Sequence, residues 1–173
     1  MKGRSAVVRS VVSVTLLICL ACVGCTRQGL NVDEAIAANK DLDRRIIEAF
    51  RAKDVDATMN CWWKSADAAF YPADNIEGQK GWDAIRASVR LAVEGMERVV
   101  SVELTEPRYI VLGDAVMGTG VLTMRIVPKG SPKEITLVTR YTDLRKKIAG
   151  KWVYVYGHES MNPMLGSENI VGG

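Results

Sequence analysis

The sequence predicts an α+β domain in which a curved antiparallel sheet carries about three helices on one side. Apolar residues recur at helical spacing in the first half of the chain, and they alternate with polar residues in the second half. Short Gly- and Pro-containing segments join the alternating runs, as in antiparallel hairpins. Helices gathered early and strands gathered late favour separate layers, and a curved sheet closed by helices would enclose a conical cavity.

The first 24 residues have the layout of a secretory leader. An uncharged, mostly apolar run covers residues 10–24, and three basic residues precede it: Lys2, Arg4 and Arg9. A basic segment followed by an apolar segment and small residues is typical of signal peptides. We therefore expect the rest of the chain to be exported.

The end of this leader resembles a bacterial lipoprotein signal. Val23 and Gly24 would precede a lipidated Cys25, although Cys22 stands where such signals usually carry Leu. We expect a chain anchored by lipid at Cys25 in the bacterial cell envelope. The alternatives are a poorer lipidation site at Cys22, ordinary cleavage with secretion or periplasmic release, and an uncleaved anchor.

Composition excludes some classes of site. The formal charge of +3 comes from the three basic residues of the leader, so residues 25–173 are neutral overall, which argues against nucleic-acid binding. If Cys25 is lipidated, Cys19 and Cys22 leave with the leader and Cys61 remains the only free cysteine, so no internal disulfide forms. Its apolar surroundings indicate a buried small side chain. No metal site and no cofactor is expected.

Three helices are expected after a linker over residues 25–30. Asn31 with Glu34 forms a helix start, followed by an amphipathic helix of about 20 residues. Asp54 begins a shorter helix that ends near Trp63, and its paired Trp62 and Trp63 would belong to the core or roof the cavity. A short strand over residues 68–71 and a third helix over residues 82–94 complete this half.

Four long strands are expected in the second half. They cover residues 99–112, interrupted near Pro107, then residues 115–127, residues 134–144 and residues 152–160. On the second of these strands one face carries Val116, Gly118, Gly120, Leu122, Met124 and Ile126, and the glycines indicate a bend or a close approach of another element. Residues 31–161 would form the domain, and residues 162–173 a disordered tail.

The last two strands supply the candidate pocket residues. Strict alternation would place Trp152, Tyr154, Tyr156, His158 and Ser160 on one face, and Val138, Arg140 and Thr142 on one face of the preceding strand. An apolar wall with a few polar groups is typical of a small-molecule site. The predicted pocket residues are Trp62, Trp63, Tyr71, Met124, Arg140, Tyr156 and His158.

Several short phrases resemble the nuclear-transport-factor-2-like superfamily and, within it, the SnoaL-like domains. They are residues 49–56, the Gly-Asp-x-Ala hairpin in residues 112–116, and residues 140–142 together with 150–152 and 158–160. The last group is also similar to the association domain of calcium/calmodulin-dependent kinase. The resemblance covers residues 31–161 and implies a cone-shaped pocket, frequent homodimers through the outer sheet face, and varied activities.

The resemblance does not transfer a function. Isomerases of this fold need a carboxylate base in the cone, and no acid in the sequence is an obvious one. The Asp-Arg-Asp arrangement of the epoxide hydrolases is also not found. His158 remains the candidate catalytic residue, although a structural histidine or a ligand contact would equally explain it.

Two functions are therefore predicted. The first is a membrane-tethered, non-catalytic module that binds a small amphipathic or acidic ligand, or that dimerises. The second is a lyase, isomerase or hydrolase that uses His158 with Tyr156 and Arg140.

Overall fold

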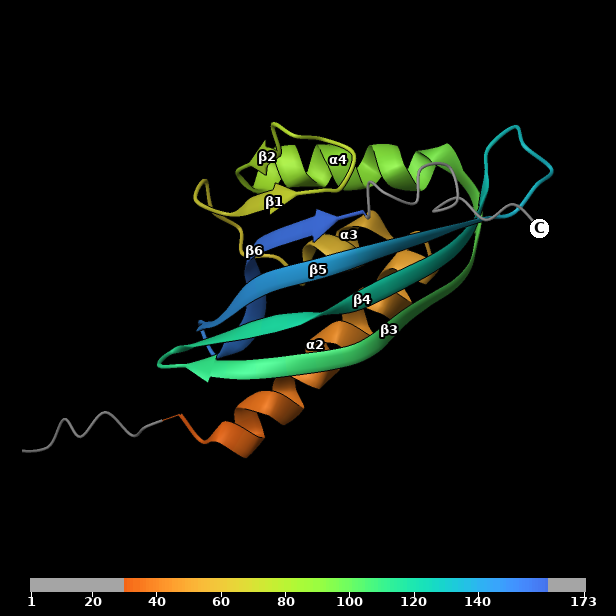
Figure 1. Ribbon diagram of the computed structural model, residues 1–173. Helices are drawn as coiled ribbons and strands as arrows, with labels where there is room; N and C mark the ends of the chain where they lie inside the picture. The colour runs from red at the N-terminus through yellow and green to blue at the C-terminus, as the bar shows by residue number, and fades with distance from the viewer. Residues whose placement is uncertain (1–29, 162–173) are drawn as a thin grey trace, which may run out of the picture.

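A computed structural model of the chain describes residues 30–161. Within these residues, three helices and six strands form one layered domain (Figure 1). In chain order the elements are α2 (Val32–Arg51), α3 (Val55–Met59), β1 (Ala69–Tyr71), β2 (Gln79–Lys80), α4 (Trp82–Gly95), β3 (Met96–Leu112), β4 (Ala115–Pro128), β5 (Ile135–Ile148) and β6 (Lys151–Ser160). The predicted α+β class and the predicted order of elements are confirmed.

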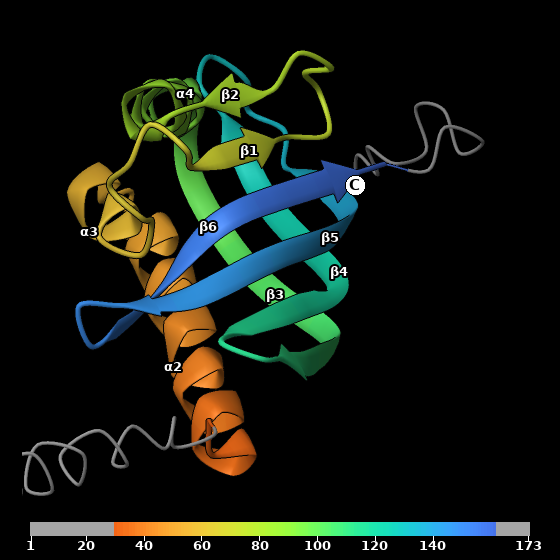
Figure 2. The ribbon, with the colours of Figure 1, turned by 90° about the vertical axis from the view of Figure 1, so that its left-hand side faces the viewer.

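The six strands form a single curved sheet in the order β2-β1-β6-β5-β4-β3. The four long strands pair antiparallel as expected, whereas the short strand β1 pairs parallel to β6, so the sheet is mixed. Figure 2 shows the long strands curving, with α4 above α3 and α2 in this view. The predicted cone with helices on one side is confirmed.

The helix starts follow the residues that predicted them. The side chain of Asn31 accepts hydrogen bonds from the backbone N–H groups of Asp33 and Glu34, and the Asp54 carboxylate accepts one from Ala57. Such caps satisfy backbone donors that have no partner inside the helix. The second helix is shorter than predicted, because it ends at Met59 and Trp62 already bridges to Tyr154 of the sheet.

The core lies between the helices and the concave face of the sheet. Buried apolar residues there include Leu42 of α2, Ile85 of α4, Val116 of β4 and Trp152 of β6. The predicted inward face of β4 is confirmed, with Val116 and Ile126 buried. Cys61 is buried, as predicted.

Another element approaches β4 closely at Gly118, as the glycine in this strand predicted. A Cβ atom at Gly118 would lie 2.6 Å from an Asp143 carboxylate oxygen and closer still to the Arg145 guanidinium. Both side chains come from the neighbouring strand β5. Only a residue without a side chain leaves room for this pair inside the sheet.

Strand β6 contains a β-bulge that the alternation of its sequence hides. Arg145 pairs with Tyr154 but Leu144 pairs with Tyr156, so Val155 is an additional residue. The side chains reverse faces at this point. Trp152 and Tyr154 are buried as predicted. The prediction that Tyr156 and His158 share their inward face is wrong, because the bulge separates the two pairs and both of these side chains are exposed.

The predicted inward face of β5 is also wrong. Thr139, Tyr141, Asp143 and Arg145 are buried, whereas the residues predicted to face inward are exposed: Val138, Arg140 and Thr142. The inward residues of β5 are mostly polar, so a search for the more apolar face selects the wrong one. Arg140 therefore lies on the convex side of the sheet.

The leader, most of the linker with Cys25, and the tail from residue 162 lie outside the described residues. Among the described residues, no helix has the length and apolar character needed to cross a membrane.

Candidate functional site

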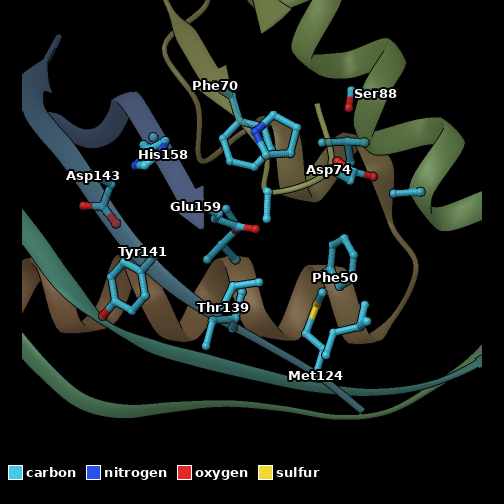
Figure 3. A pocket seen from close by; sticks show the side chains of 18 of the residues that line it. Phe50, Phe70, Asp74, Ser88, Met124, Thr139, Tyr141, Asp143, His158 and Glu159 are labelled. Atoms are coloured by element: carbon cyan, nitrogen blue, oxygen red, sulfur yellow. The ribbon is translucent and has the colours of Figure 1, made fainter. Parts of the chain in front are cut away.

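A pocket of about 920 Å³ opens between the concave face of the sheet and the helices α2 and α4. This volume falls in the range of small-molecule sites, about 300–1,000 Å³. Its walls are mainly apolar and come from several elements: Ile46 and Phe50 of α2, Val89 and Leu91 of α4, Leu122 and Met124 of β4, and Phe70 of β1. Figure 3 shows Phe50, Phe70 and Met124 around this space.

Two buried hydroxyl groups in the wall of this pocket have no hydrogen-bond partner among residues 30–161. They are Oγ1 of Thr139 and Oη of Tyr141, whose residues are 4% and 8% exposed. The residues stand two apart on β5, so both side chains face the pocket (Figure 3). An unpaired buried hydroxyl costs free energy, about 1–3 kcal/mol, which a ligand with a polar group would recover.

Glu159 extends this polar strip onto the next strand. Glu159 of β6 lies opposite Tyr141 of β5 in the ladder, and both line the pocket. Burial is the main cause that raises the pKa of the Glu159 carboxyl to about 7, and the nearby Asp74 carboxylate adds to it. Figure 3 shows Glu159 between Phe70 and Thr139. A carboxyl with this pKa can give or accept a proton near neutral pH.

A buried ionic cluster closes the inner end of the pocket. The Arg145 guanidinium, which is 0% exposed, donates to Asp143 at 2.6 and 2.8 Å and to Asp43 of α2 at 3.1 Å. Tyr109 donates to Asp43 at 2.6 Å, and Tyr154 donates to the other Asp43 oxygen. The cluster ties α2 to three strands of the sheet.

This cluster brings together an Asp, an Arg and a second Asp, an arrangement that was not visible in the sequence. Asp43 lies about a hundred residues before Asp143 and Arg145, which is why the sequence does not display it. The four acceptor contacts of Asp43 are taken by Arg145, Tyr109 and Tyr154. Asp143 is held by Arg145 and by the Gly118 N–H, and burial is the main cause that raises the pKa of its carboxyl. With these contacts occupied, the cluster fits a structural role better than water activation.

A family model for the SnoaL-like domain matches residues 40–164. The chain belongs to the SnoaL-like domain family. None of the curated proteins matches its sequence.

Solved structures with the nuclear-transport-factor-2-like fold are similar to this SnoaL-like domain. One is a superfamily member from Salmonella enterica, with a TM-score of 0.64, 16% identity, and coverage of 69% of this chain and 85% of that one. Another, named a candidate dehydratase from Streptomyces avermitilis, has a TM-score of 0.65, 16% identity, and coverage of 75% and 97%.

A third similar structure is named a candidate calcium/calmodulin-dependent protein kinase II association domain, from Xanthomonas campestris. Its TM-score is 0.62 at 19% identity, with coverage of 75% of this chain and 86% of that one. At these identities the similarity establishes the fold alone. The predicted resemblance to SnoaL-like and nuclear-transport-factor-2-like domains is confirmed.

Three of the predicted site residues line the pocket of this SnoaL-like domain: Trp62, Met124 and His158. Trp62 is mostly core, since its ring packs against Phe70 and Tyr154 with centroids 5.6 and 5.5 Å apart. The exposed side chain of His158 meets the pocket at its rim.

The other four predicted residues do not line the pocket: Trp63, Tyr71, Arg140 and Tyr156. Tyr71 packs on Tyr156 with ring centroids 5.8 Å apart. Arg140, the predicted guanidinium of the site, is exposed. The residues that replace them are Thr139, Tyr141 and Glu159, each one position away from a predicted residue on β5 or β6.

Within residues 30–161, no group of three or more His, Cys, Asp and Glu side chains is placed to hold a metal ion.

Proposed function

We propose that this SnoaL-like domain binds a small, mostly apolar molecule that carries a polar group. The observation that supports this most directly is the pair of unpartnered hydroxyls, Thr139 Oγ1 and Tyr141 Oη, in the wall of an apolar pocket. Buried polar groups are almost always hydrogen-bonded in folded proteins. A bound ligand with a hydroxyl or carbonyl group would satisfy both.

A pocket-filling substitution tests this proposal. Leu122 lines the pocket, whereas Thr123, the next residue of β4, faces the other side of the sheet and does not line it. The uncharged fluorescent probe N-phenyl-1-naphthylamine should bind one to one to the wild type and to Thr123→Trp. Leu122→Trp should lose binding because the indole occupies the space. Equal binding by both variants would contradict the proposal.

The membrane setting remains part of the proposal. A lipid at Cys25 would hold the domain close to the bacterial membrane, where mostly apolar molecules concentrate. Mass spectrometry of the protein from the membrane fraction should find the mature chain starting at a diacylated Cys25. A Cys25→Ser variant should appear in the soluble fraction, and a wild-type chain without lipid would contradict the anchor.

A homodimer through the convex face of the sheet also remains a proposal. Val138 and Tyr156 are exposed apolar side chains on this face, together with the exposed Arg140. The two side chains lie at different positions along the sheet, since Tyr156 pairs with Leu144 and not with Val138, so an interface that covers both would extend along β5. Sedimentation at high protein concentration should detect a dimer that Val138→Glu weakens. Only monomer in the wild type would contradict it.

An acid–base enzyme is the second candidate function. The pKa of about 7 at Glu159, with the Tyr141 hydroxyl on the opposite residue of β5, favours proton transfer to or from a bound carbonyl compound. The enzyme alternative therefore depends on Glu159 rather than on His158 with Tyr156 and Arg140.

Deuterium exchange distinguishes the enzyme from the binding module. Apolar ketones such as 2-octanone should incorporate deuterium beside the carbonyl in D₂O if Glu159 removes that proton. Exchange should be lost in Glu159→Gln and retained in His158→Gln. If the wild type binds the ketone but exchange is no faster than in buffer, the enzyme alternative is contradicted and the binding function stands.

A further inference from the structure

The charged side chains that line the pocket are of one sign. Its lining contains five acidic residues, namely Asp43, Asp74, Glu77, Asp143 and Glu159, and among the described residues that line it none is Lys or Arg. Arg145, which does not line the pocket itself, forms ion pairs with Asp43 and Asp143. The other three acids lie away from this guanidinium, so the pocket has an acidic end.

Glu159 and Asp74 form the central pair of this acidic end. Asp74 belongs to the loop between β1 and β2, and its carboxylate acts on that of Glu159, which stands inside the pocket. The Glu159 carboxyl accepts no hydrogen bond and makes no ion pair within the described part of the chain. The other titratable residues of the pocket lining are Glu77 from the same loop, Asp43 of α2, Tyr141 and Asp143 of β5, and Tyr154 and His158 of β6.

The surfaces beside this carboxyl pair are aromatic and apolar. Phe70 and Phe50 line the same pocket as Glu159 (Figure 3). An ammonium group is attracted by aromatic faces as well as by carboxylates. The expectation of an acidic ligand depended on an inward-facing Arg140, which the structure does not have.

We propose that the pocket selects a cationic amphiphile, an apolar molecule with an ammonium group, which Glu159 and Asp74 bind while its chain lies along the apolar walls. This inference rests on the proposed function and specifies the ligand class of the same pocket. The unpartnered Thr139 and Tyr141 hydroxyls, both more than nine-tenths buried and facing this space, independently indicate that a ligand belongs there.

The proposal predicts that binding depends on pH. A cation favours the ionised form of Glu159, whose carboxyl has a pKa of about 7 in the empty pocket, so binding below this pH releases a proton. Affinity for a permanently charged ligand should therefore rise from pH 6 to pH 8. Any contribution of the His158 imidazole to this rise would persist when Glu159 is replaced.

Three probes with the same eight-carbon chain test the proposal by calorimetry: octyltrimethylammonium, 1-octanol and octanoate, each below micelle formation. At pH 8 the wild type should bind the ammonium at least tenfold more tightly than the alcohol, and octanoate most weakly. Glu159→Gln should bring the ammonium to within about twofold of the alcohol and remove most of the pH dependence. Asp74→Asn, in an exposed loop that tolerates substitution, should weaken the ammonium alone.

The outcomes separate the two proposals. Binding of 1-octanol as tight as that of the ammonium, or tighter binding of octanoate, would overturn the cation preference and leave the proposed function standing. Unchanged ammonium affinity in both Glu159→Gln and Asp74→Asn would also overturn it. Binding of none of the three probes would contradict the proposed function itself.

Discussion

Tyr141 and Glu159 lie opposite each other on adjacent strands, and both side chains face the pocket. Side chains on directly opposed residues of a sheet lie about 4.5–5.5 Å apart at Cβ, so the two groups act on one ligand atom or on neighbouring ones. Glu159 faces the same side of the sheet as Tyr141 only because the bulge at Val155 exchanges the two faces of β6 from that residue on. The position of the bulge therefore decides the chemistry of the site.

Glu159 should make the stability of the fold depend on pH. Its carboxyl holds a proton more tightly in the folded state, with a pKa of about 7, than in the unfolded state, near 4.5. This contribution is complete below about pH 4.5 and is lost as the pH rises to 7. The free energy of unfolding of Glu159→Gln, relative to that of the wild type, should therefore increase by roughly 1–3 kcal/mol from pH 5 to pH 8 in denaturant melts. A difference independent of pH would contradict the assignment.

Tyr141 and Tyr154 should respond differently to the loss of their hydroxyl groups. The Tyr141 hydroxyl has no hydrogen-bond partner in the described part of the chain. Tyr141→Phe should therefore leave the free energy of unfolding unchanged or raise it by up to about 1 kcal/mol, while weakening the binding of 1-octanol. Tyr154 donates to buried Asp43, so Tyr154→Phe should lose about 1–3 kcal/mol. Equal losses in urea melts would show that the Tyr141 hydroxyl has a partner.

Gly118 should not tolerate a methyl group. Gly118→Ala would push against Asp143 and Arg145 and should lose roughly 1–3 kcal/mol of stability, as overpacked cores do. Gly95, the last residue of α4, has no atom within 4 Å of the position that a Cβ would take, so Gly95→Ala serves as the control and should lose nothing. Thermal melts of the two variants that coincide would contradict the close packing around Gly118.

Trp152 is the structural tryptophan of β6. It is 6% exposed and belongs to the core cluster, so Trp152→Ala should lose roughly 3–5 kcal/mol. Denaturant unfolding followed by circular dichroism measures this loss. A loss below about 1 kcal/mol would contradict its burial.

Local signals in the sequence predicted most of the fold. The caps at Asn31 and Asp54 predicted the helix starts, and the alternation from Val116 to Ile126 predicted the inward face of β4. These features depend on neighbouring residues alone. The same is true of Gly118, whose position in a strand already indicated a close neighbour.

The site was less predictable because two of its features are not local. No residue type marks the bulge at Val155, and its alternating aromatic neighbours favour an unbroken strand. The inward face of β5 is polar because Arg145 pairs with Asp43 of a distant helix. One sign was visible in the sequence. Asp143 and Arg145 stand two residues apart on one strand, so they share a face and can form an ion pair there.

Methionine methyl spectra test the central claim, an open ligand pocket on the concave side of the sheet, most directly. Met124 lines the pocket, whereas Met117 of the same strand faces the opposite side and does not line it. In protein labelled with ¹³C at the methionine methyl groups, 1-octanol should shift the Met124 signal and leave that of Met117 in place. An unmoved Met124 signal, or an equal shift of both, would contradict the account.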